Sequence, residues 1–498
     1  MRRTTRSLAI LIVAAGASAE AYGQGRTPSG VLLGEETDKP TIISISSPGP
    51  FVAGRWSGYA DLGEGPEDIV IRVVEFDGSA QGEVEQGDAA RDALALVDLP
   101  SRSVFGYPAE EFARDAEGLS FTIAAAGPSG GEFVLRGEPT RRSEGESYAI
   151  EGTAFYTPAA GGGGEADLEP TRGPFLLSLT PDPDRGEPYS IEIEGGALAG
   201  SLVMPEAARG WNVPVALILA GSGEADRDGN NYNVPGRSDC LALLARELRS
   251  RGVASLRYDK RDSGESLASA PTDPSFDDYV DDAEHALREL ASDPRFSEIV
   301  VVGHAEGALV GAAALAREGG GFKGRVRGLA ALCASGMTEG EILRRELRLS
   351  IEDGFAELSD DERAALASEA ESIVASLEAG ESFPDPSAEL AVFFDLSAQA
   401  YYASALRYDI RAEAASIGLP LLVVAGGADL QVPAEEAEVL LEARPDAAYR
   451  VIEGMSHSLK AVGDDEDTNY ASFLDPSFPL GEGLVDLIAA FARGDSLP

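Results

Sequence analysis

Basic side chains are scarce in this chain of 498 residues. Lysine and arginine together number 40 against 85 aspartates and glutamates, which gives a formal net charge of −45 at pH 7. This balance argues against nucleic acid as a partner, because a polyanion is bound through clustered basic residues that displace its counterions. It disfavours an anionic membrane surface for the same reason. Hydrophobic residues still make up 44% of the chain, which is typical of a globular protein.

Cysteine and histidine are also rare. The two cysteines, Cys240 and Cys333, are too few for a disulfide framework, and both have apolar neighbours in the sequence, so we expect two buried thiols rather than a bridge.

The stretch from Asp226 to Asn231 superficially resembles a calcium loop, but it lacks the bidentate glutamate that completes such a loop. We therefore expect a turn held by Asx side chains, and neither a metal nor a cofactor.

No apolar run is long enough to span a bilayer, which takes about 20 residues. The longest candidate is Leu8–Ala15, which follows three arginines and precedes the small residues 17–19. This layout is typical of a secretory signal peptide, which we assign to residues 1–23; a membrane anchor is the alternative. We expect an exported protein, periplasmic or extracellular, with no membrane span once the signal is cleaved.

The rest of the chain divides into two parts. Residues 24–50 are rich in Gly, Pro, Ser and Thr and suggest a linker. Residues 51–180 contain short strand-like runs separated by turn residues, which indicates an antiparallel all-β domain, either a sandwich or a small barrel. This domain could be a ligand-binding module or a support for its neighbour. The clearest runs are 69–76, 119–123, 132–135, 148–155 and 175–179.

From residue 186 to 498 apolar strands alternate with helical segments. This pattern predicts an α/β domain with a mostly parallel sheet covered by helices on both faces, and places a site at the carboxyl ends of the strands. Residues 336–415 interrupt the alternation with a helical insertion in which Ser359 and Glu362 form a capping box. The insertion is interpreted as a cap over the strand ends, with a dimerisation element as the alternative.

One strand–turn–helix segment carries the chemistry. The strand Ile299–Val302 runs into Gly303-His304-Ala305-Glu306-Gly307 and then a helix rich in small residues. This is the context of a nucleophile elbow, G-x-S-x-G, in which a sharp turn presents a serine hydroxyl. Here the central residue is Ala305, whose methyl group has no lone pair to attack a carbonyl.

At this point the chain resembles the α/β-hydrolase superfamily, in its carboxylesterase or serine-peptidase-like branch. The resemblance covers about residues 190–495 and rests on several segments in the family's order. In the second of these, Asp262 stands where the family usually has glycine. The segments are 219–229, 257–266, 303–307, 425–433 and 454–457.

The resemblance implies a catalytic triad and an oxyanion hole. The nucleophile position falls on Ala305, the acid on Asp429 and the base on His457, while the backbone N–H groups of Ser222 and Glu306 would bind the oxyanion. In such a triad the carboxylate fixes the imidazole tautomer and stabilises the imidazolium. The implied ligand is a small acyl ester or amide.

Three accounts of Ala305 remain open: a degenerate hydrolase that binds a ligand without cleaving it, an enzyme that uses Asp429 and His457 as a proton-abstracting dyad, or a sequence change in an ordinary esterase. A substitute nucleophile from one of three loop serines is conceivable, but none of them follows a strand in an elbow sequence. Their positions are Ser222, Ser263 and Ser335. We expect negligible turnover of esters or amides, and His304 should only pack against the neighbouring loop.

Overall fold

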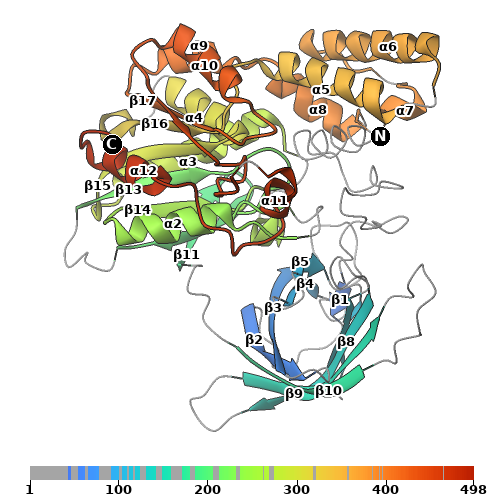
Figure 1. Ribbon diagram of the computed structural model, residues 1–498. Coiled ribbons are helices and arrows are strands. Elements are labelled where there is room, and N and C mark those ends of the chain that lie inside the picture. The colour runs from blue at the N-terminus through green and yellow to red at the C-terminus, as the bar shows by residue number, and fades with distance from the viewer. Residues whose placement is uncertain are drawn as a thin grey trace.

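The computed structural model describes two groups of secondary structure (Figure 1). It describes residues 43–45, 54–61, 66–77, 91–99, 104–108, 111–115, 118–123, 131–141, 148–158 and 171–179. It also describes residues 186–498 apart from 206–211, 232–235, 262, 269–273, 318–320, 356–357, 384, 392, 395 and 464. The expected signal peptide 1–23 lies outside the described residues, as does most of the linker 24–50.

The N-terminal group is one antiparallel sheet of ten strands. The strands follow the order β1-β4-β3-β2-β10-β9-β8-β7-β6, with β5 paired to β4, and the sheet curls on itself in Figure 1. An antiparallel β domain therefore precedes the α/β part, as predicted. The bounds are β1 Ile43–Ile45, β2 Gly54–Asp61, β3 Pro66–Asp77, β4 Arg91–Leu99, β5 Val104–Pro108, β6 Glu111–Asp115, β7 Gly118–Ile123, β8 Gly131–Arg141, β9 Tyr148–Pro158 and β10 Thr171–Leu179.

One strand of this sheet lies inside the range 24–50 that was interpreted as a linker. Strand β1 pairs with β4 in antiparallel register, Ile43 opposite Ala93 and Ile45 opposite Arg91. Its Ile-Ser-Ile alternation has the two-residue period of a strand, but the surrounding Thr, Ser and Pro residues obscured it.

The second group is a mixed sheet of eight strands in the order β11-β12-β14-β13-β15-β16-β17-β18. The pairings β11·β12 and β12·β14 are antiparallel, and all those from β14 to β18 are parallel. The predicted α/β class is correct. The bounds are β11 Glu187–Ile193, β12 Gly196–Val203, β13 Val213–Leu219, β14 Ala254–Tyr258, β15 Phe296–His304, β16 Val326–Leu332, β17 Leu421–Gly426 and β18 Ala448–Ile452.

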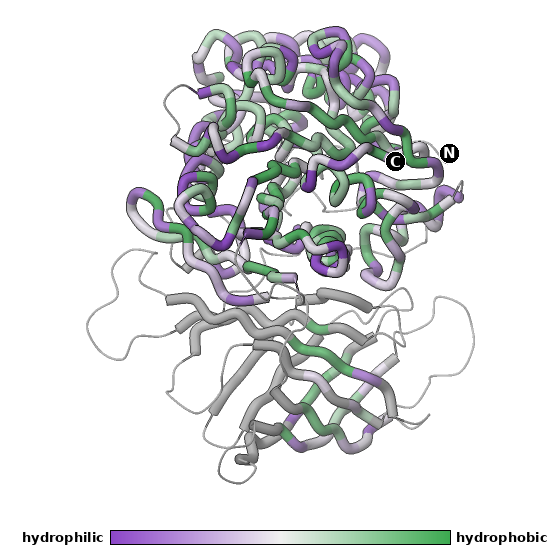
Figure 2. The backbone as a smooth tube through the Cα atoms, turned by 90° about the vertical axis from the view of Figure 1, so that its left-hand side faces the viewer, coloured by the Kyte–Doolittle hydropathy of each residue, from purple (hydrophilic) through white to green (hydrophobic). Residues whose placement is uncertain are grey.

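Helices cover both faces of this sheet because alternate strand residues point to opposite sides. In β13, Val215 and Leu217 join the core formed with α3 (Phe276–Ser292), α4 (Glu306–Ala316), α9 (Ile410–Ser416) and α10 (Ala434–Ala443). Ala216 and Ile218 face α2 (Cys240–Ser250) and α12 (Leu484–Arg493). In Figure 2 the central strands are accordingly hydrophobic, and hydrophilic stretches lie on the outer helices and loops.

The helical insertion contains a core of its own. Four helices pack around Leu347, Ile373 and Phe394. These helices stand apart from the sheet in Figure 1. Their bounds are α5 Glu339–Gly354, α6 Asp360–Glu378, α7 Ala388–Ala391 and α8 Leu396–Ala405. The predicted capping box of Ser359 and Glu362 begins α6, and a second one at Thr338 begins α5. The fifth helix of the predicted range 336–415, α9, packs in the sheet's own core.

The sequence from Ser238 to Arg251 also has the pattern of a helix capped by Ser238, and the structure differs at its start. Helix α2 does not begin at Ser238: its N-cap is Asp239 in a left-handed conformation without a side-chain cap, and the amide of Leu241 donates instead to the Asp228 carbonyl at 3.1 Å. Cys240 and Cys333 are buried free thiols, as expected. In the described part of the chain we find no helix with the length and apolarity needed to cross a membrane. The remaining short elements are η4 Gly264–Ala268, η5 Lys323–Arg325 and α11 Glu466–Ala471.

Candidate active site

The segment at the end of β15 has the backbone of a nucleophile elbow. Ala305 lies between β15 and α4 with φ 49° and ψ −118°, a conformation that a residue with a side chain seldom adopts. Such a conformation costs about 1–3 kcal/mol and persists only where the surroundings enforce it. Here the Ala305 amide donates to the Leu332 carbonyl at 2.9 Å, and its own carbonyl accepts from the Ala308 amide at 3.0 Å.

The two glycines of the elbow are required by close backbone approach. A Cβ atom on Gly303 would lie 2.4 Å from the backbone nitrogen of Ala308, and one on Gly307 would lie 2.4 Å from the carbonyl oxygen of Leu219. Neither position has room for a side chain. The turn therefore holds Ala305 at the carboxyl end of the central strand, where the sequence predicted it.

The predicted acid and base meet across two loops. Asp429 follows β17 and His457 follows β18, and Nδ1 of His457 lies 2.9 Å from Oδ2 of Asp429. The other carboxylate oxygen accepts the amides of Gln431 and Val432, both at 2.8 Å. Burial raises the pKa of Asp429, but His457 and these hydrogen bonds outweigh it and hold that pKa below its ordinary value. The carboxylate is therefore ionised and can orient the imidazole.

His304 contributes more than the packing expected from the sequence. Its Nε2 lies 2.8 Å from the carbonyl oxygen of His457, and the two rings are 4.9 Å apart. Burial, with His457 nearby, lowers the pKa of His304 to about 4, so the ring is neutral at pH 7. As a neutral donor it fixes the backbone that carries the predicted base. Its position directly before Ala305 was the only sequence signal for this contact.

The two predicted oxyanion-hole donors lie at the ends of neighbouring parallel strands. Ser222 follows β13, and Glu306 is the first residue of α4 after β15. Among the described residues neither backbone N–H has a hydrogen-bond acceptor. The first amides of a helix have no partner within it and are suited to an anionic oxygen.

The loop that carries Ser222 is held by an Asx turn and an ion pair. Asp226 Oδ1 accepts the amides of Asp228 at 2.9 Å and Asn230 at 2.8 Å, as expected for the turn. Burial, with Asp228 and Asp259 close by, raises the pKa of Asp226 to about 8. The next residue, Arg227, makes a buried bidentate contact with Asp259, at 2.9 Å and 2.5 Å.

Two of the three loop serines considered as substitute nucleophiles are hydrogen-bonded to other groups. Ser263 Oγ is buried and donates to the Ala225 carbonyl at 2.9 Å. Ser335 Oγ donates to Glu436 at 2.9 Å. In the part of the chain that the structure describes, no serine hydroxyl is hydrogen-bonded to His457, so the imidazole activates none of them.

Cys333 lies beside the acid and base. Its Sγ and the ligand atoms of Asp429 and His457 all lie within 4.8 Å of one another. Burial, with the negative charge of Asp429, raises the pKa of the Cys333 thiol well above its ordinary value. A metal ligand must be a thiolate, whereas these surroundings favour the protonated thiol, so the cluster fits a hydrogen-bonded thiol better than a metal centre.

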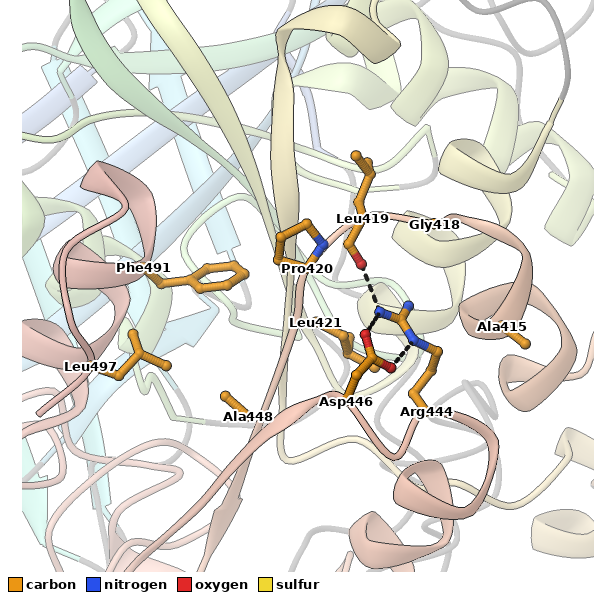
Figure 3. Close-up of a pocket in the computed structure, with 10 residues that line it drawn as sticks. All are labelled: Ala415, Gly418, Leu419, Pro420, Leu421, Arg444, Asp446, Ala448, Phe491 and Leu497. Atoms are coloured by element: carbon orange, nitrogen blue, oxygen red, sulfur yellow. Dashed lines mark hydrogen bonds and ion pairs between the residues drawn. The ribbon is translucent and has the colours of Figure 1, made fainter.

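A separate hollow lies at the amino ends of β17 and β18, at the edge of the sheet opposite to the elbow. It encloses about 510 Å³, and Figure 3 shows Arg444 bridging Asp446 and the carbonyl of Leu419 along its wall. None of the predicted site residues lines it.

Comparisons with known proteins agree with this fold. Residues 236–353 match the family described as serine aminopeptidase, S33. Esterase EstD of Thermotoga maritima is 26% identical over 292 residues, which cover 58% of this chain and 63% of the esterase, so the match spans less than two thirds of that relative.

Two solved structures are similar to this chain at lower sequence identity. Est1E of Butyrivibrio proteoclasticus with bound ferulic acid is 17% identical, with a TM-score of 0.40; the match covers 61% of this chain and 96% of Est1E. The esterase domain of a Rhodothermus marinus protein is 16% identical, with a TM-score of 0.34; the match covers 57% of this chain and 94% of that domain.

Proposed function

This chain belongs to the α/β-hydrolase superfamily, in its esterase branch, and on that premise we propose that it keeps a carboxylic-ester hydrolase site whose nucleophilic hydroxyl is missing. The proposed ligand is a small acyl ester or amide. The observation that carries the proposal is the 2.9 Å contact between His457 and Asp429 at the same strand ends as the strained turn at Ala305.

The arrangement is consistent with the separate roles that the three residues of a catalytic triad have. With a hydroxyl at position 305, His457 would take its proton as the oxygen attacks the ligand carbonyl, and Asp429 would stabilise the imidazolium. The amides of Ser222 and Glu306 would bind the negative charge that develops on the carbonyl oxygen. With Ala305 no acyl intermediate can form on this residue, so the proposed site binds an ester without cleaving it.

Restoring the hydroxyl tests the proposal. Loss of the nucleophile costs on the order of 10⁶ in kcat in a triad enzyme, so Ala305→Ser should raise turnover of p-nitrophenyl acetate by at least about 10³-fold and allow labelling by a fluorophosphonate. The double variant with His457→Ala, and the natural chain, serve as controls at background turnover. A folded but inert Ala305→Ser chain would overturn the proposal.

The intact acid and base pair favours one alternative, an enzyme that needs no serine. His457, oriented by Asp429, would then abstract a proton from a carbon acid. In that case the natural chain should catalyse deuterium exchange at the α-carbon of a β-keto ester, and His457→Ala should abolish the exchange. If the natural chain exchanges no faster than His457→Ala, this alternative is excluded and the non-catalytic ester-binding site remains.

Export is the second part of the proposal. The support is the sequence alone: three arginines, the apolar stretch Leu8–Ala15 and small residues after it. Expression of the full chain in a bacterium should yield a product outside the cytoplasm whose N-terminus, by Edman sequencing, lies near residue 24, just after the assigned signal peptide. A full-length product retained in the cytoplasm would contradict it.

A further inference from the structure

We propose that Lys260 is a positioning residue that fixes the two backbone amides of the oxyanion hole relative to each other. We further propose that Tyr401 makes their placement depend on the helical cap, the insertion of residues 336–415. The inference rests on the proposed function, since it concerns the same two backbone amides. It adds two residues that the sequence did not indicate as part of the site.

Lys260 contacts the two loops that carry the two amides. It follows β14 by two residues and is buried, with 6% of its surface exposed. Its Nζ donates to the carbonyl of Gly223 at 3.1 Å, next to Ser222, and to Oε1 of Glu306 at 2.9 Å. One ammonium therefore connects the residue after one donor with the side chain of the other donor.

The surroundings leave this ammonium little freedom. Besides its two acceptors it lies 4.5 Å from the centre of the Tyr279 ring, which attracts a cation through its face. Glu306 is also buried, with 7% exposed. Removing one member of a buried pair leaves the other charge uncompensated. The contact is therefore maintained, and it fixes the separation of the Gly223 loop and the first turn of α4.

The cap completes the arrangement through Tyr401. This residue lies in α8, and its hydroxyl donates to Oε2 of Glu306, the oxygen that Lys260 does not use. Burial, with Glu306 and Glu339 nearby, raises the pKa of Tyr401 well above its ordinary value, so it stays a donor. The same helix is tied to the sheet domain by the Phe276 amide, which donates to Ser404 Oγ at 2.7 Å.

It follows that the oxyanion hole is fixed from two directions. Lys260 acts from the sheet and Tyr401 from the cap, and both act on the carboxylate of Glu306. A cap that moved away from the sheet would release one of the two oxygens and loosen the first turn of α4, which bears the donor amide.

The experiment uses Lys260→Met and a matched control, Arg261→Gln. Arg261 is the next residue, is equally buried, and pairs with Asp278 and Asp282 rather than with either loop. Both variants keep Ala305. Hydrogen–deuterium exchange should rise in peptides covering 220–224 and 304–308 for Lys260→Met and stay unchanged there for Arg261→Gln. This readout does not require activity.

The second readout uses the Ala305→Ser background. There Lys260→Met should lower kcat by about 10²-fold or more, the size of effect seen when an oxyanion donor is lost, with KM changed less than about threefold, and Lys260→Arg should recover part of the loss. Tyr401→Phe should lower kcat by a smaller factor, and Tyr402→Phe, on the same helix, should not.

The outcomes separate this inference from the proposed function. If Ala305→Ser is inert but exchange rises only at the two loops, the proposed function fails and the positioning role stands. Unchanged exchange at both loops would overturn the positioning role. So would equal effects of Lys260→Met and Arg261→Gln, or a loss that falls on KM rather than kcat.

Discussion

At the residue scale, substitution of Gly307 tests whether close backbone packing around the elbow contributes to stability. An added Cβ would approach two backbone oxygens, those of Leu219 at 2.4 Å and Ala220 at 2.6 Å, and neither can turn aside as a flexible side chain would. Overpacking of this kind costs about 1–3 kcal/mol or more. Gly307→Ala should therefore lower the free energy of unfolding in urea by at least that amount. Gly324→Ala, where no atom lies within 4 Å, should change it little; equal losses would contradict the argument.

His304 predicts a pH dependence of stability. Its pKa is about 4 in the folded chain against 6.5 ordinarily, because it is buried beside His457. Between these values the unfolded chain binds the extra proton, so the free energy of unfolding falls as pH drops from about 6.5 to about 4, by roughly 3 kcal/mol in total. Above pH 6.5 the contribution is complete.

The measurement compares the natural chain with His304→Gln, which keeps a donor near the His457 carbonyl but does not titrate. Urea unfolding at pH 7, 5.5 and 4.5 should show a steeper decline for the natural chain. Parallel declines would mean that other groups account for the acid sensitivity.

The sequence identified some site residues and missed others for physical reasons. Ala305, Asp429 and His457 each follow a strand in a short motif, and parallel strands bring their carboxyl ends to one edge, so their meeting could be predicted. Their catalytic roles stay predictions. Tyr401 lies 95 residues from Glu306 in an insertion with no readable motif, and only the folded chain brings the two together.

At the scale of elements, the contact between α8 and α3 determines how firmly the cap is attached. Ser404 Oγ accepts the amide of Phe276, the first residue of α3, at 2.7 Å. Leaving a buried amide without its acceptor costs about 1–3 kcal/mol. Ser404→Ala should therefore speed cleavage within the cap by a protease at native conditions and lower stability. Ser416→Ala, which loses only an exposed bond within α9, is the control; identical cleavage rates would contradict this attachment.

Element types were easier to predict than element ends. The apolar strands of the parallel sheet and the capping box of Ser359 came directly from the pattern, because both are local in sequence. The clearest runs in the sequence did not include strands β2, β4, β5 and β6, because strand formation depends strongly on the partners that a segment packs against. The start of α2 at Cys240 depends on the Asp228 carbonyl, which accepts the Leu241 amide, and no pattern within the helix itself reveals that contact.

At the scale of the whole molecule, the net charge of −45 predicts a stabilising effect of salt. Like charges repel more in the compact state than in the unfolded chain, and about 0.1 M salt screens charges beyond roughly 10 Å. The melting temperature should rise between 10 mM and 300 mM NaCl by scanning fluorimetry. KCl should give the same rise, because screening is independent of the cation. A rise with one cation alone would indicate specific binding, and a fall would mean that local ion pairs dominate.

The strained turn at Ala305 has a consequence for the history of this chain. Alanine and serine codons can differ by a single base, and the bend, its glycines, and the Asp429–His457 contact remain in the folded chain. One point mutation would therefore place a hydroxyl on a turn that is already shaped for it. On the proposed function, a single base change is then enough to complete the triad.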